Sequence, residues 1–225
     1  MILSSAEWEI VRLSLLVGAV ACAGTLPAAF ALAWVLARTR FPGRVLLDGV
    51  VHLPLVVPPV VTGWVLLMAF APGGPLGALS SGVLFRWTGA AIASGVMALP
   101  LMVRGIRLGL EGVDRRLEGA ARTLGASPAR VFRTITVPLA MPGVLAALVL
   151  GFARSVGEFG ATITFVSSVP GETETLPLAI SAALQRPGGE AAVWRLAAVS
   201  VALSLAALVA SEMLARRSAR GVHVL

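Results

Sequence analysis

The chain has 225 residues, of which 57% are hydrophobic and only 13% are charged, and its mean hydropathy is +0.91. Soluble domains carry about 25% charged residues, so this composition excludes a water-soluble globular protein and predicts an integral membrane protein with several spans. The net charge of +7 comes from 18 arginines without a single lysine, which excludes a Walker A nucleotide-binding loop and is typical of cytoplasmic loops rather than of nucleic-acid binding.

Five apolar stretches are long enough to cross a bilayer, which takes about 20 helical residues. We expect spans over residues 13–37, 50–71, 88–110, 137–159 and 191–215. Pro54, Pro58 and Pro59 lie in the first half of the second span, where their missing N–H groups predict a kink or a break. The chain is therefore expected to be all-α, a polytopic helical bundle that forms one transmembrane domain over residues 1–225.

The arginines are distributed unevenly between the two sides of these spans. Three groups fall on one side, namely Arg38, Arg40 and Arg44, then Arg115, Arg116, Arg122, Arg130 and Arg133, and finally Arg216, Arg217 and Arg220. Cytoplasmic loops collect positive charge in membrane proteins. We therefore expect a multi-pass protein of the cytoplasmic (inner) membrane, with an external N-terminus and a cytoplasmic C-terminus.

Two connections are long, a cytoplasmic loop over residues 111–136 and an external loop over residues 160–190. In the first, apolar residues recur at helical spacing from Leu117 to Leu124 and predict a short helix that ends at Gly125. Ser127-Pro128 then predicts the start of a second helix. A short exposed helix with an apolar face suits docking into a groove of a partner, and it suits lying on the membrane surface equally well.

Residues 118–125 (EGAARTLG), followed nine residues later by Ile135-Thr136-Val137-Pro138, resemble the EAA loop of ABC importer permeases. The family pattern has no residue between its glutamate and its alanine pair, where this chain has Gly119, and it has leucine at the position of Val137. The resemblance implies a coupling helix that rests in a cleft of a separate ATP-binding subunit. The ATPase-coupling residues that it implies are Glu118, Gly119, Ala120, Ala121, Leu124, Gly125 and Pro138.

Arg154 and Glu158 are spaced i, i+4 near the outer end of the fourth span. Ionisable residues within a membrane are candidates for a functional site, and a pair that only orients neighbouring helices is the alternative. A tetrahedral dianion needs hydrogen-bond donors and positive charge, which Arg154 and the hydroxyl groups of Thr162 and Thr164 could supply. These four residues are the candidates for a translocation pathway.

The stretch 157–166 (GEFGATITFV), with Pro170-Gly171-Glu172-Thr173 and Leu176-Pro177 after it, is similar to the molybdate ABC transporter permeases. Sulfate permeases share the Gly-Glu-aromatic-Gly core. Tungstate is chemically so close to molybdate that the sequence does not distinguish the two as substrates. The resemblance implies the MetI-like permease fold, a homodimer, two ATP-binding cassette subunits and a periplasmic molybdate-binding protein. ATP hydrolysis would belong to the separate subunit, and no cofactor is implied.

Three alternatives remain beside a molybdate importer. The nearest is a sulfate or thiosulfate importer permease of the same kind. A stand-alone secondary transporter is disfavoured, because the sequence shows no inverted repeat and few intramembrane charges. A membrane enzyme is disfavoured as well, because one cysteine, Cys22, and two separated histidines, His52 and His223, offer neither a catalytic constellation nor a metal site.

Overall fold

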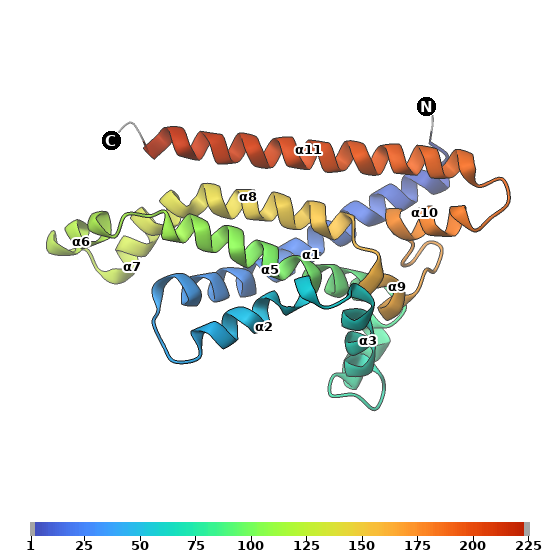
Figure 1. The fold of residues 1–225 in the computed structure, drawn as a ribbon, viewed down its shortest axis with the longest axis horizontal. Helices are drawn as coiled ribbons and strands as arrows, with labels where there is room; N and C mark the ends of the chain where they lie inside the picture. Colours follow the sequence, from blue (N-terminus) through green and yellow to red (C-terminus); the bar gives the residue numbers. More distant parts are fainter. Residues whose placement is uncertain (1–2, 223–225) are drawn as a thin grey trace.

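The computed structural model of the protein describes residues 3–222, with side chains described for residues 3–213. Within that part all regular secondary structure is helical, and no strand is present. Figure 1 shows an elongated bundle in which α1 (Ser5–Arg38), α5 (Trp87–Glu111), α8 (Val137–Val156) and α11 (Glu190–Val222) run along the long axis. The all-α fold expected from the composition is confirmed.

Among the described residues, four helical segments are long and apolar enough to cross a membrane, and a fifth is added if the bent pair α2 and α3 counts as one span. The helices extend beyond the expected spans at most ends. Helix α1 begins at Ser5, because Ser4 and Glu7 exchange side chain to backbone hydrogen bonds and cap its first turn. In contrast, α8 ends at Val156 and not at residue 159.

The second span is broken, as its prolines predict. It consists of α2 (Arg44–Val56) and α3 (Pro59–Phe70), whose axes differ in direction by 109°. Pro58 precedes α3 and Pro59 occupies its first turn, where a missing N–H costs nothing. Pro54 is accommodated within α2. In Figure 1, α3 projects away from the long axis of the bundle.

The remaining elements are short. They are η1 (Gly77–Leu79), α4 (Ser80–Val83), α6 (Arg115–Thr123), α7 (Pro128–Val131), a π-helical segment η2 (Phe132–Thr136), α9 (Gly160–Val166) and α10 (Leu176–Leu184). In Figure 1, α6 and α7 lie at the end of the bundle where α11 finishes, and α9 and α10 lie at the opposite end, where α1 starts. The predicted arginine-rich groups therefore gather at one end, although the side chains of Arg216, Arg217 and Arg220 lie outside the described residues.

The centre of the bundle is formed by close packing of α5 against α8. A Cβ atom added to Gly143 would lie 2.7 Å from Gly109 Cα, and one added to Gly105 would lie 2.8 Å from Ala147 Cβ. Small residues allow helix backbones to approach in this way in membranes, where van der Waals contact is the main attraction between helices. Leu36 of α1 is fully buried beside this interface, together with Met102 and Ile106 of α5.

Candidate functional site

The short helices of the loop over residues 111–136 form because the sequence supplies capping residues at their ends. The carboxylate of Asp114 accepts a hydrogen bond from the Arg116 backbone N–H at 2.8 Å and begins α6. Gly125 follows the helix with φ +85°, the left-handed conformation that glycine adopts without strain. The hydroxyl of Ser127 then caps α7, with Pro128 in its first turn. The predicted pair of helices is confirmed.

The apolar side of α6 faces away from the rest of the chain. Leu117 is 47% exposed and Leu124 is 88% exposed, while Ala120 is exposed and Ala121 is half-buried. Gly119 is exposed and Pro138, in the first turn of α8, is exposed as well. Within the described part of the chain this apolar surface of a charged helix is left uncovered, which is the arrangement that a partner's groove would cover.

Glu118 is the exception among the expected coupling residues, because it points into the chain. Its two carboxylate oxygens accept hydrogen bonds from the two terminal nitrogens of Arg38, at 2.9 Å and 3.1 Å. The Thr136 hydroxyl donates to Glu118 Oε1 at 2.7 Å, and Arg38 also donates to the Leu110 carbonyl at 3.2 Å. This buried cluster joins the end of α1, the end of α5, the helix α6 and the segment η2.

Aromatic rings pack on the outer side of this cluster. The Arg38 guanidinium lies 5.6 Å from the centre of the Trp34 ring, a favourable cation–π distance. The Phe132 ring meets Trp34 edge to face at 5.0 Å. A cavity of about 370 Å³ beside them is lined by Arg115 and Arg122 as well as by the cluster. Neither Arg38 nor the aromatic residues were expected from the sequence, because no spacing rule links residues 80 positions apart.

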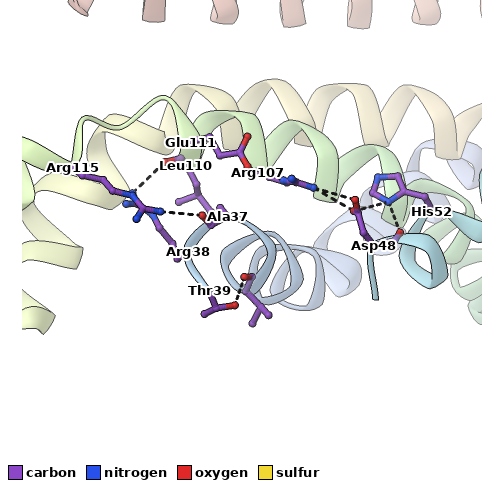
Figure 2. A network of polar contacts seen from close by, with 10 residues as sticks. Ala37, Arg38, Thr39, Asp48, His52, Arg107, Leu110, Glu111 and Arg115 are labelled. Atoms are coloured by element: carbon purple, nitrogen blue, oxygen red, sulfur yellow. Dashed lines mark hydrogen bonds and ion pairs between the residues drawn. The ribbon is translucent and has the colours of Figure 1, made fainter. Parts of the chain in front are cut away.

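A second polar network connects α2 with α5, and Figure 2 shows it together with Arg38 and Leu110 of the first. Arg107 of α5 forms ion pairs with Asp48 of α2 at 3.3 Å and with Glu111 at 2.9 Å. His52 hydrogen-bonds the backbone carbonyl of Asp48 at 2.8 Å. These contacts are partly exposed, and the ion pair between Arg107 and Asp48 connects α5 to α2.

The expected pair Arg154–Glu158 is formed at the other end of α8. Arg154 Nη1 lies 2.6 Å from Glu158 Oε2, and the Glu158 side chain is only 1% exposed. The second oxygen of Glu158 accepts the Ala161 backbone N–H at 2.8 Å and so caps α9. Of the two threonines on α9, Thr164 donates its hydroxyl to the Gly160 carbonyl, and the buried hydroxyl of Thr162 has no hydrogen-bond partner among the described side chains.

Helix α9 packs directly on α3, so that the break in the second span meets the break that follows α8. A Cβ atom added to Gly63 would lie 2.9 Å from both Ala161 Cα and Thr164 Cβ, and would also collide with the Ala161 carbonyl oxygen. A Cβ atom on Gly160 would lie 2.8 Å from Pro59 Cβ. Glycine is therefore required at this contact. The sequence predicted the break in the second span, but neither the break after α8 nor the contact between α3 and α9.

The chain matches one family and several characterised relatives. Residues 26–220 match the family model described as "Binding-protein-dependent transport system inner membrane component". The chain is 53% identical over 223 residues to the molybdenum transport system permease protein ModB of Escherichia coli (strain K12), covering 97% of both proteins. It is 53% identical over 218 residues to ModB of Haemophilus influenzae, covering 94% of both. It is 36% identical over 195 residues to the sulfate transport system permease protein CysT of Salmonella typhimurium, covering 85% of this chain and 70% of the relative.

Two solved structures share the fold. One is a bacterial ABC transporter involved in the import of alginate, with a TM-score of 0.70 and 17% identity, covering 97% of this chain and 80% of that chain. The other is the inward-facing MetNI methionine ABC transporter, with a TM-score of 0.67 and 16% identity, covering 95% of this chain and 94% of that chain. These likenesses confirm the predicted permease fold.

Proposed function

The chain belongs to the binding-protein-dependent transport system inner membrane component family, and on this premise we propose that it is the permease subunit of an ABC importer for molybdate or tungstate. The observation that carries the proposal is the identity to two molybdenum permeases over almost the whole chain. The sulfate permease is less similar and matches over a shorter stretch, which favours molybdate over sulfate.

The importer would be assembled around a homodimer of this chain, because one copy shows no internal duplication and would supply half of a pathway. Two ATP-binding cassette subunits would bind on the cytoplasmic side, and a periplasmic molybdate-binding protein would bind outside. The arginine-rich end of the bundle, with α6 and α7, would face the cytoplasm. The chain has no lysine for a Walker A loop, so ATP hydrolysis is assigned to its partner and the chain itself is not an enzyme.

The mechanism proposed is ATP-driven alternating access. Closure of the ATP-binding subunits would displace α6, which presents Leu117, Ala120 and Leu124 as its exposed apolar surface. The long helices would follow this displacement as rigid bodies and would open the pathway to the other side. Movement of the helices as rigid bodies suits this bundle, because α5 and α8 are in direct backbone contact.

The pathway residues would hold the substrate weakly. Arg154 is 30% exposed, and the buried carboxylate of Glu158 forms an ion pair with it. An arginine with a paired charge retains free N–H donors for an oxyanion while releasing it easily. The hydroxyl of Thr162 has no hydrogen-bond partner within the described part of the chain, but the residue is only 1% exposed, so it would reach a substrate only if α9 moves.

Substrate competition tests the proposed substrate. In proteoliposomes with the complete importer, uptake of labelled molybdate should be inhibited by tungstate at similar concentrations, since the two oxyanions share charge and shape. Sulfate, which is smaller, should inhibit only at about a hundredfold higher concentration. Inhibition by sulfate at the same concentration as tungstate would instead favour the sulfate or thiosulfate importer. Uptake without ATP would favour a secondary transporter.

Arg154→Ala is expected to lower the stability of the permease by about 3 kcal/mol, because it leaves a buried carboxylate without its partner. Combining it with Glu158→Gln should restore much of that stability, since the amide is neutral and its oxygen can still cap α9. Thermal unfolding of the purified permease measures both effects. Uptake by the stabilised double variant then isolates the pathway role, and we expect a reduction of about tenfold. Uptake at the normal rate would remove Arg154 from the pathway.

A further inference from the structure

Glu118 lies on the coupling helix but not on its docking surface. The family pattern places its glutamate directly before the alanine pair, a position held here by the exposed Gly119, where an added Cβ atom would meet nothing within 4 Å. Adjacent residues of an α-helix point about 100° apart. The carboxylate at 118 is therefore turned away from the exposed surface and into the chain.

The contacts of Glu118 are those of a rigid connection. The side chains of Glu118 and Arg38 are each only 10% exposed, and they meet through two parallel hydrogen bonds, a geometry that fixes both distance and orientation. The buried hydroxyl of Thr136 occupies a further acceptor position of the carboxylate. A buried ion pair adds little net stability compared with apolar packing, so its presence is better explained by the geometry that it imposes.

The cluster lies where three long helices meet the cytoplasmic loop. Arg38 is the last residue of α1, and it also donates to the carbonyl of Leu110 near the end of α5. Thr136 is the last residue of η2, directly before α8. The π-helical segment adds a residue to the turn there, which is a feature found often at functional sites. A displacement of α6 would thus act on α1, α5 and α8 through a single carboxylate.

We infer that Arg38, Glu118 and Thr136 form a joint that transmits the motion of α6 to the membrane-spanning helices. The inference rests on the proposed function, and it assigns Glu118 to transmission within the chain and not to contact with the ATP-binding subunit. Arg38 and Thr136 become positioning residues for the transport step. Trp34 and Phe132 pack beside the joint and restrict the positions open to the Arg38 side chain.

The test compares docking with coupling in the complete reconstituted importer. Three variants weaken the joint: Glu118→Gln removes the charge, Thr136→Val removes the hydroxyl at nearly constant volume, and the combination Arg38→Met with Glu118→Leu leaves no unpaired charge. We expect the ATP-binding subunit to remain attached in all three. The amount of molybdate moved per ATP hydrolysed should fall about three- to tenfold, a range typical of altered coupling between sites. Arg38→Lys, which keeps the charge pair, should retain more coupling than the double variant.

Glu111→Gln is the matched control, because Glu111 forms an ion pair of similar length at the same end of the bundle but is 41% exposed. Its transport per ATP should be unchanged. Loss of the ATP-binding subunit from Glu118→Gln, but not from the control, would identify Glu118 as a docking residue and overturn the inference while the proposed function stands. Normal transport per ATP in Thr136→Val and in the assembled double variant would overturn it as well. Uptake by the unaltered importer that needs no ATP would overturn both.

Discussion

Leu124→Ser is expected to detach the ATP-binding subunit from the permease. The Leu124 side chain is 88% exposed at the end of α6, so the isolated chain leaves its apolar surface unburied. Burying a leucine side chain contributes about 1.5–3 kcal/mol, and its loss should weaken the complex about 10- to 100-fold. Co-purification of the ATP-binding subunit with the tagged permease, followed by titration of the purified subunit, measures this affinity.

Leu184→Ser is the control for this variant. Leu184 is 68% exposed at the end of α10, and Figure 1 places this helix at the opposite end of the bundle from α6. The Leu184→Ser substitution makes the same chemical change on a similarly exposed side chain, and it should leave the affinity of the permease for the ATP-binding subunit unaltered. Equal retention of the subunit by both variants would contradict the assignment of α6 as the docking helix.

Gly63→Ala is expected to disrupt the contact between α3 and α9. The new Cβ atom would lie closer to Ala161 and Thr164 than van der Waals contact allows, and one of the atoms it meets is a backbone carbonyl oxygen that has no freedom to rotate away. Overpacking of this kind costs about 1–3 kcal/mol, and the two helices must separate to relieve it. Thermal unfolding of the purified permease should show the loss, and uptake should fall with it if these breaks move during transport.

The same substitution at Gly49 provides the comparison. Gly49 lies in α2, and a Cβ atom there would meet nothing within 4 Å. Replacing a helical glycine by alanine in open space is neutral or stabilises the helix by up to about 1 kcal/mol. The two alanine variants should therefore shift the melting temperature in opposite directions, or at least by clearly different amounts. Identical melting temperatures would show that α3 and α9 are less tightly packed than the structure indicates.

Local sequence signals predicted the parts of the fold that depend on local chemistry. Gly125 marks the end of α6 and Ser127 the start of α7, because caps and left-handed turns act within a few residues. The prolines located the break in the second span, but the angle of 109° depends on packing against distant helices. The early start of α1 was missed because hydrophobicity alone marked the span, although Ser4 and Glu7 carry the spacing of a capping box.

The site was predictable to a similar extent. The spacing of Arg154 and Glu158 indicated an ion pair, and the pair is present, although Glu158 lies beyond the end of α8 and caps the next helix. For Glu118, the sequence predicted the helix that carries the residue, but it did not indicate the buried partners of its carboxylate. Its partner Arg38 belongs to the end of another span, and no periodicity connects residues that meet only through the tertiary packing of α1 on α5.

The sharp turn between α2 and α3 determines which side of the molecule can face lipid. Pro58 and Pro59 carry no N–H, so the carbonyl groups of Pro54 and Leu55 have no donor one helical turn ahead. Hydrocarbon cannot hydrate such carbonyls, and irregular backbone at membrane depth is tolerated only against protein or beside water. The α2–α3 side would thus face water or another protein. The surface of α11 over residues 190–213, which is apolar and largely exposed, would then face the acyl chains.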